Sequence, residues 1–289
     1  MKAIIFGANG QDGFFLSELL KTKNISVACI SRSKGDLVGD VADYDFVLRT
    51  IKNYKPNYIF HFAANSTINH DSLFENHQAI STGTLNILEA VRLYALNARV
   101  FLSGSALQFK NDGAPINEAS LFEATSAYSV ARIQSLYAAR YYRTAFKLNI
   151  FFGYLFNHDS SMRSEVHVNQ KIACAVKRIA KGRDEKIELG NINIRKEFNY
   201  AGDIVEAIWV LINQNNYFEA VIGSGKSYSI IDWLEYCFKK INKNWEDFVV
   251  LNPDCNREYK ILVSDPALIK SLGWAPKVNF HQLADMMLS

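Results

Sequence analysis

Three glycines near the start of the chain have the spacing of a phosphate-binding loop. Gly7, Gly10 and Gly13 follow an apolar run and are separated by Ala8-Asn9 and Gln11-Asp12. Glycine permits a tight turn and lets the backbone approach a pyrophosphate, and the free N–H groups of a following helix attract the anion. An ordinary glycine-rich turn is the alternative, but a strand before and a helix after favour nucleotide binding. We therefore expect a nucleotide cofactor to contact Gly7, Asn9, Gly10, Gln11, Asp12 and Gly13.

The residues after the second predicted strand indicate which dinucleotide binds. An acidic residue here would accept a hydrogen bond from the ribose 2′-hydroxyl of NAD. The chain instead has Ser31-Arg32-Ser33-Lys34, and a cation with hydroxyls suits the 2′-phosphate of NADP. We predict that Ser31 and Arg32 contact NADP, with NAD as the alternative. Four further residues at strand ends and helix starts are expected to contact the cofactor: Asp40, Val41, Ala63 and Ala64.

The first half of the chain alternates short apolar runs with amphipathic stretches. Strands predicted over 2–6, 25–30, 58–63, 99–102 and 149–152 alternate with helices over 14–21, 46–54, 82–94 and 127–144. Such alternation is typical of parallel βαβ units. The predicted fold class is therefore α/β, a Rossmann-type doubly wound parallel sheet whose ligand binds at the carboxyl ends of the strands.

After about residue 157 the regular alternation stops. Helices predicted over 169–181, 204–214 and 230–241 are separated by short strands and polar turns, without a low-complexity linker. We predict an NAD(P)-binding Rossmann domain over residues 1–156 and a smaller C-terminal α/β substrate lobe over 157–289, some of whose segments return to the first domain.

Composition and charge argue against several other classes of protein. A hydrophobic content of 49% with 21% charged residues is typical of a folded globular protein, and a net charge of +3 without a Lys/Arg block gives little support for nucleic-acid binding. No apolar run approaches the roughly 20 residues of a membrane span. The four cysteines are scattered, no signal peptide is evident, and the six histidines lack metal-ligand spacing. We expect a cytoplasmic protein with reduced thiols and no metal site.

The glycine loop and Tyr128-Ser129-Val130-Ala131-Arg132 together resemble the extended short-chain dehydrogenase/reductase family. Within it, the chain is most similar to GDP-mannose 4,6-dehydratases and the related GDP-4-keto-6-deoxymannose reductases. Similar segments extend along nearly the whole chain: Gly10–Gly13, Leu155–Ser160, Lys171-Ile172, Leu189–Asn191, Tyr228-Ser229, Asn252–Arg257 and Leu272–Trp274. The resemblance implies an NAD(P)-dependent enzyme acting on a nucleotide-linked hexose, with GDP the favoured nucleotide, and a homo-oligomer, either a dimer or a tetramer.

The same resemblance implies which residues hold the sugar nucleotide. Asn157, Lys171 and Arg257 match positions with that role, and either Arg195 or Lys196 falls where the family has another nucleotide-contacting arginine. The chemistry is suitable, because a diphosphate attracts a lysine ammonium and an arginine fork and a sugar forms amide hydrogen bonds. Taken singly, each cation is more often a solvated surface charge, but their shared location in the predicted substrate lobe favours binding.

The catalytic positions also follow from the resemblance. In the family a tyrosine transfers a proton at the sugar oxygen while the nicotinamide exchanges hydride, and a lysine four residues later lowers the tyrosine pKa and binds the nicotinamide ribose. Tyr128 matches the tyrosine, and Arg132 stands at the lysine position, one helical turn away. Aligning Phe109 with a family tyrosine places Ser105 at the catalytic Ser or Thr position, where it would hydrogen-bond the reacting oxygen. Ser105, Tyr128 and Arg132 are therefore the predicted catalytic residues, and the last two also contact the cofactor.

Two positions depart from the family pattern. Leu107 stands where the dehydratases have a glutamate that shuttles the proton when water is eliminated across C5 and C6. A leucine cannot transfer a proton, so 4,6-dehydration is disfavoured unless another acid reaches the sugar: Glu118, Glu123 or Glu165. Arg132 keeps the positive charge that favours a tyrosinate, but it is bulkier than lysine and cannot lose a proton.

These features favour one function and leave two open. Hydride transfer with one proton is the chemistry that the remaining groups support, which predicts an NADPH-dependent reductase of a nucleotide-linked, GDP-favoured 4-keto sugar in activated deoxysugar biosynthesis. The second reading is a dehydratase or epimerase that returns the hydride to the same sugar. The third, motivated by Arg132, is a catalytically impaired sugar-nucleotide binder.

Overall fold

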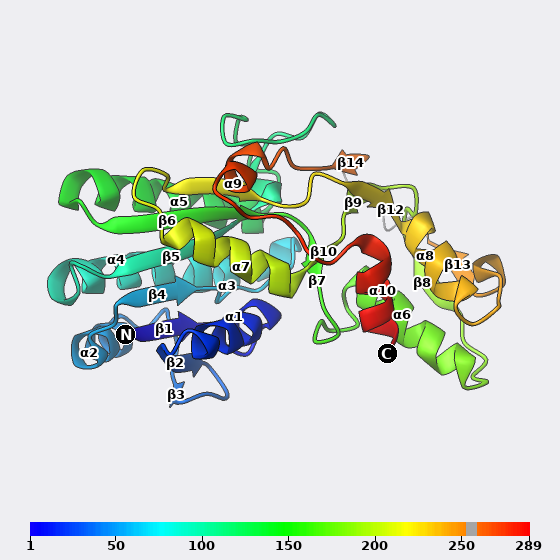
Figure 1. Cartoon of the computed structure of the whole chain (residues 1–289), viewed down its shortest axis with the longest axis horizontal. Helices are drawn as coiled ribbons and strands as arrows, with labels where there is room; N and C mark the ends of the chain where they lie inside the picture. The colour runs from blue at the N-terminus through cyan, green and yellow to red at the C-terminus, as the bar shows by residue number, and fades with distance from the viewer. Residues whose placement is uncertain (253–258) are drawn as a thin grey trace.

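A parallel sheet forms the centre of the computed structural model, which describes residues 1–252 and 259–289. Its seven strands lie in the order β11-β6-β5-β4-β1-β2-β3, and neighbouring strands are parallel. They are β1 (Lys2–Phe6), β2 (Ser26–Ser31), β3 (Leu37–Val38), β4 (Tyr58–His61), β5 (Arg99–Ser105), β6 (Asn149–Leu155) and β11 (Glu219–Ile222) (Figure 1). The chain reverses its winding direction between β1 and β4, and ligands of such sheets bind at the carboxyl ends of the strands there.

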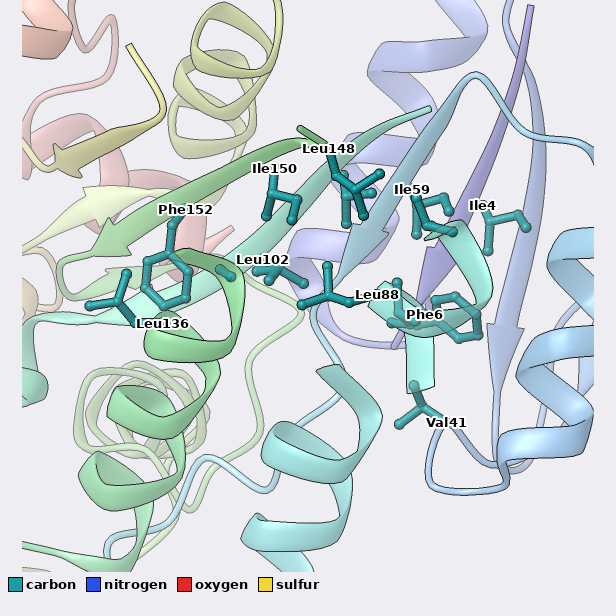
Figure 2. Packing of buried hydrophobic residues seen from close by; sticks show 14 of the residues in the cluster. Ile4, Phe6, Val41, Ile59, Leu88, Leu102, Leu136, Leu148, Ile150 and Phe152 are labelled. Atoms are coloured by element: carbon teal, nitrogen blue, oxygen red, sulfur yellow. The ribbon is translucent and has the colours of Figure 1, made fainter. Parts of the chain in front are cut away.

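Helices cover both faces of the sheet because alternate strand residues point to opposite sides. Ile4 and Phe6 of β1 pack in one core, and Ala3 and Ile5 pack in the other. Figure 2 shows side chains of the first core, with Leu88 among them. This face is covered by α2 (Tyr44–Tyr54), α4 (Gly83–Tyr94) and α5 (Ala127–Phe146), and the opposite face by α1 (Gln11–Thr22) and α7 (Ala201–Ile212). The Rossmann-type fold class is confirmed.

An ionic cluster fixes α5 against the edge of the sheet. Glu219 of β11 accepts hydrogen bonds from Arg140 Nη2 at 2.7 Å, from Arg143 Nη2 at 2.8 Å and from the Tyr154 hydroxyl at 2.8 Å. Burial acts to raise the pKa of Glu219, but the hydrogen bonds from the two arginines and Tyr154 outweigh it and hold that pKa at about 2. The helix that carries Tyr128 is therefore held in a fixed position.

The second lobe has its own core. Residues of α6 (Val168–Ala180), α8 (Ile230–Lys239) and α10 (Phe280–Leu288) pack together around Trp233 and Leu283, on the side of the molecule where the C-terminus lies (Figure 1). Short strands complete this lobe: β8 (Ile187–Leu189) with β13 (Val249–Leu251), β9 (Arg195–Glu197) between β12 (Ser227–Ser229) and β14 (Ile261–Leu262), and β7 (His158–Asp159) with β10 (Asn199–Tyr200).

Several segments after residue 157 return to the central sheet. Strand β11 extends it beyond β6, α7 packs on α1, and Trp274, beyond α9 (Ala267–Ser271), joins the core on the α7 side. The indole Nε1 of Trp274 donates to the carbonyl of Asp203 at 2.9 Å. The division into residues 1–156 and 157–289 stays a prediction.

In the part of the chain that the structure describes, no helix is both long enough and apolar enough to cross a bilayer. Within the same residues, no group of three or more histidine, cysteine and acidic side chains is arranged to hold a metal ion.

Candidate active site

The glycine loop between β1 and α1 requires glycine at its two ends. Gly7 has φ +84°, and a Cβ there would lie 2.5 Å from the backbone nitrogen of Ala63. A Cβ on Gly13 would lie 2.6 Å from the Cα of Ala8, so the loop and the first turn of α1 could not approach each other. Gly10, the residue before α1, has no side chain to cap the helix. The first N–H groups of α1 are thus suited to bind an anion, which fits the diphosphate of a dinucleotide.

A cavity of about 600 Å³ opens at the carboxyl ends of the strands, between the sheet and the second lobe. Its wall combines the glycine loop, residues 64–68 after β4, residues 103–107, one face of α5, residues 155–159, Arg163 and residues 166–169. Lys196 and Leu262 of the second lobe complete it. A sugar nucleotide and the nicotinamide end of a cofactor would meet in a space of this kind.

Gln11 and Asp12 of the glycine loop contact the second lobe. Gln11 Nε2 donates to the carbonyl of His158 at 3.1 Å, and the Ser160 hydroxyl donates to Gln11 Oε1 at 2.9 Å. His158 Nε2 lies 2.9 Å from Asp12 Oδ1, and its Nδ1 lies 2.7 Å from the carbonyl of Phe156. Both of these oxygens only accept hydrogen bonds, so the doubly protonated imidazolium is the form of His158 that satisfies both contacts.

Electrostatics support a charged pair of Asp12 and His158. Burial acts against the charge on each side chain, but the opposite charge outweighs it, so the pKa of Asp12 is lowered and that of His158 is raised. We refer to Gln11, Asp12, His158 and Ser160 as the inter-lobe contact, because it joins the cofactor loop to β7 and the residue that follows it.

The three predicted catalytic residues all line the cavity. Tyr128 is the second residue of α5 and Arg132 follows one turn later, with its guanidinium carbon 5.0 Å from the centre of the Tyr128 ring. Arg132 is buried and donates through Nη1 to the backbone carbonyl of Ser103 and, at 2.9 Å, to the Ser103 hydroxyl oxygen. Ser105 ends β5, and its hydroxyl oxygen accepts a hydrogen bond from the Leu107 N–H at 3.2 Å.

The predicted substrate residues fall into two groups. Asn157 and Lys196 line the cavity, and the buried Asn157 Oδ1 has no hydrogen-bond partner among the described residues. Arg195 points away, donating to the Ser227 carbonyl at 2.7 Å, because neighbouring residues of a strand face opposite sides. Lys171 lies on α6 outside the cavity wall and donates to the Glu188 carbonyl at 2.6 Å. Arg257 lies outside the described residues.

The remaining predicted cofactor contacts are Asn9 of the glycine loop and residues at or just after the ends of β2, β3 and β4. Asn9 Nδ2 donates to the Ser31 hydroxyl oxygen at 2.7 Å, which ties the glycine loop to β2. That oxygen also accepts from the Lys34 N–H at 3.0 Å, so the Ser31 hydroxyl is already engaged within its own turn. Arg32 is exposed and ion-paired. Asp40 is exposed, Val41 is buried, and Ala63 and Ala64 follow β4.

Sequence comparisons decide the family. The profile of the GDP-mannose 4,6 dehydratase family matches residues 4–287. The chain belongs to this family. GDP-mannose 4,6 dehydratase 1 of Arabidopsis thaliana is 29% identical to it, over 99% of this chain and 88% of the relative. This confirms the predicted enzyme class. The protein is an oxidoreductase-type enzyme of nucleotide sugars in the extended short-chain dehydrogenase/reductase family.

Solved structures share the fold at low sequence identity. The dTDP-glucose 4,6-dehydratase of Bacillus anthracis in complex with NAD has a TM-score of 0.87 and 15% identity, covering 100% of this chain and 95% of that one. RMD from Pseudomonas aeruginosa complexed with NADPH has a TM-score of 0.86 and 17% identity, covering 99% and 97%.

Among the described residues, no glutamate lines the cavity beside the predicted catalytic residues. Leu107 lines the wall. Of the three acids considered as replacements, Glu118 accepts the Val221 N–H at 2.7 Å, Glu165 pairs with Arg178 at 2.9 Å, and neither they nor Glu123 line the cavity. Among described residues the cavity has two carboxylates, Asp12 and Asp159, and Asp159 accepts from Asn169 Nδ2 at 2.6 Å.

Sequence reasoning missed several residues of the cavity wall. His158, Arg163 and Asn169 lie in it, and within the described part of the chain the buried Asn169 Oδ1 has no hydrogen-bond partner. Arg163 follows the recognised Leu155–Ser160 segment closely, so a search of that loop for cations would have found it. The burial of His158 against Asp12 had no such signal, because the two are 146 positions apart.

Proposed function

We propose that this protein is an NADPH-dependent reductase of a nucleotide-linked 4-keto sugar. One observation supports this proposal most strongly. Tyr128, Ser105 and Arg132 line one cavity, but Leu107 occupies the position where the resemblance to the dehydratases implies a glutamate. A proton donor beside a cofactor site suffices for ketone reduction, whereas elimination of water requires a further group to move a proton.

The residues of the cavity divide the reduction among them. When bound, a nicotinamide cofactor would supply hydride to C4 of the sugar. Tyr128 gives its phenolic proton to the oxygen that becomes the new hydroxyl, and Ser105 donates a hydrogen bond to the same oxygen. Arg132, held by Ser103, places a positive charge over the Tyr128 ring and so stabilises the tyrosinate that remains.

We propose that the nucleotide is GDP, as the relatives' names suggest. Lys196 and Arg163 bring positive charge to the cavity. Asn157 Oδ1, which has no partner in the part of the chain that the structure describes, can accept a hydrogen bond from a sugar hydroxyl. Of the other sequence candidates, Lys171 and Arg195 have protein partners in this structure, and Arg257 remains a proposal from sequence.

The cofactor preference rests on Arg32, a cation at the end of β2. We keep NADP as the proposed cofactor and NAD as the alternative. A cytoplasmic location and a homo-oligomer also remain proposals.

The second candidate function is a 4,6-dehydratase, which the family match favours.

One experiment separates the two functions. The pure protein is incubated with GDP-mannose and, separately, with GDP-, dTDP-, UDP- and CDP-4-keto sugars, while NADPH absorbance and product mass are followed. A reductase consumes one NADPH per sugar reduced. Conversion of GDP-mannose to its 4-keto-6-deoxy product without net NADPH consumption would establish the dehydratase instead. Binding of NADPH and of a sugar nucleotide without turnover of either would indicate the catalytically impaired binder.

A further inference from the structure

A carboxylate from a distant part of the chain is paired with the proposed cofactor-selecting cation. Arg32 Nη2 lies 3.1 Å from Glu75 Oε1. Glu75 belongs to the short helix α3 (Leu73–Asn76), and its second oxygen accepts from Asn65 Nδ2 at 2.8 Å. Asn65 lies in the loop after β4 that lines the cavity. Glu75 therefore joins the end of β2 to the cavity loop.

The Arg32–Glu75 pair is charged but easily displaced. Hydrogen bonds from Asn65 and Arg32 hold the pKa of Glu75 below its usual value. The Arg32 side chain is 63% exposed and that of Glu75 is 42% exposed. Exposed ion pairs contribute little free energy, so a doubly charged phosphate can compete for the same guanidinium.

We propose that Glu75 is a cofactor-specificity residue that weakens the preference for NADP by competing with the 2′-phosphate for Arg32. The inference rests on the proposed cofactor site. In related dinucleotide sites, an acid at the end of the second strand selects NAD, and this chain has none there in sequence. Glu75 supplies a carboxylate at that place through the tertiary fold. A 2′-phosphate must displace it from Arg32 and stay close to its charge, whereas NAD, which has only a hydroxyl there, need not.

The test measures dissociation constants for NADPH and NADH with the full-length protein, by calorimetry without substrate. Four proteins are compared: wild type, Glu75→Gln, Arg32→Ala and the double variant. Gln keeps an oxygen that accepts from Asn65, so the loop is preserved. We expect Glu75→Gln to tighten NADPH roughly threefold to tenfold and to leave NADH within about twofold. In the Arg32→Ala background the same change should have little effect on NADPH, since nothing remains to compete for.

Glu18→Gln is the matched control, because Glu18 is exposed and pairs with Lys21 at 2.7 Å on α1, and it should change neither affinity. Equal tightening of both cofactors by Glu75→Gln, or the same gain with and without Arg32, would overturn the competition. Wild-type protein that bound neither cofactor would overturn the proposed function itself. The variants test only the competition between Glu75 and the 2′-phosphate, so the two failures can be told apart.

Discussion

At the scale of single residues, the replacement of the family's lysine by Arg132 is accommodated by Ser103. The hydroxyl of Ser103 donates to the His61 carbonyl at 2.9 Å and accepts from Arg132, so both of its hydrogen-bonding roles are used. Arg132 lies close to the buried imidazole of His61, and burial followed by the charge of Arg132 lowers the pKa of His61 to about 3. His61 is therefore neutral and adds no second positive charge beside Arg132.

The proton donor can be tested by Tyr128→Phe. This variant should bind cofactor and sugar nucleotide as wild type does, because only the phenolic oxygen is lost. Turnover should fall by roughly 10²–10⁴-fold if Tyr128 is the general acid. Single-turnover kinetics with calorimetric binding controls would measure this, and unchanged turnover would remove Tyr128 from the mechanism.

The role of the guanidinium can be tested by Arg132→Lys. A lysine has one nitrogen in place of the arginine fork, so we expect the contacts with Ser103 to weaken and kcat to fall about tenfold or more, since hydrogen bonds to charged groups contribute about 1.5–3 kcal/mol. Arg92→Lys, on α4 and paired with Glu89, is the control and should be neutral. Equal or higher activity of Arg132→Lys would mean that Arg132 only replaces the lysine charge.

At the scale of secondary-structure elements, the inter-lobe contact connects the first turn of α1 with β7. The side chains of Asp12 and His158 are 19% and 11% exposed, so removing one partner leaves a largely buried charge. This contact holds the glycine loop beside the loop that carries Asn157. The proposed cofactor and substrate sites would thereby be positioned relative to each other.

This contact predicts a dependence of stability on pH. The pKa of His158 is raised, so its contribution is complete below the ordinary value of about 6.5 and is lost as the pH rises through the raised value. The pKa of Asp12 is lowered, so its contribution is complete above about 3.9 and is lost as the pH falls through the lowered value. Melting temperatures should therefore decline above neutral pH.

The matched comparison is Asp12→Asn, which removes the partner charge. It should destabilise the protein at neutral pH by less than the about 3–5 kcal/mol typical of a fully buried pair, because both side chains are partly exposed. Its melting temperature should decline less between about pH 6 and 9 than that of wild type. Parallel melting curves against pH for the two proteins would show that the pair is not what titrates. Thermal scans across this pH range provide the measurement.

At the scale of the whole molecule, α4 and α5 present apolar side chains to solvent. Tyr137 and Tyr141 of α5 are 56% and 59% exposed, and Leu85 of α4 is 47% exposed. Tyr137 and Tyr141 are one turn apart on α5, and exposed apolar surface of this kind is typical of subunit interfaces. We therefore place the proposed homo-oligomer contact on these two helices.

Light scattering after size exclusion would test this placement. Tyr137→Lys with Tyr141→Lys should convert the oligomer to monomer, because two charges would be buried in the contact. Tyr217→Lys changes a tyrosine that is 45% exposed outside these helices and should leave the mass unchanged. A wild-type protein that was already monomeric would remove the proposal.

Local sequence alone determined the parts of the fold that depend on neighbouring residues. The strand predicted over 2–6 is β1 (Lys2–Phe6), and the helix predicted over 127–144 is α5 (Ala127–Phe146). Hydrophobic periodicity and glycine spacing are local properties, so they located the glycine loop and the helix that carries Tyr128 and Arg132. The family resemblance singled out Tyr128, Arg132, Ser105 and Asn157, which line one cavity.

Only the tertiary structure decided which side chains meet across the chain. It separated Lys196 from Arg195 by the side of β9 that each faces, and it placed Glu75 beside Arg32 and His158 beside Asp12. Charge pairs of this kind have no periodicity or spacing in the sequence, because they form where distant elements pack together. The positions of these charge pairs follow from how the elements pack together. The proposed effect of Glu75 on cofactor selectivity therefore depends on the tertiary structure.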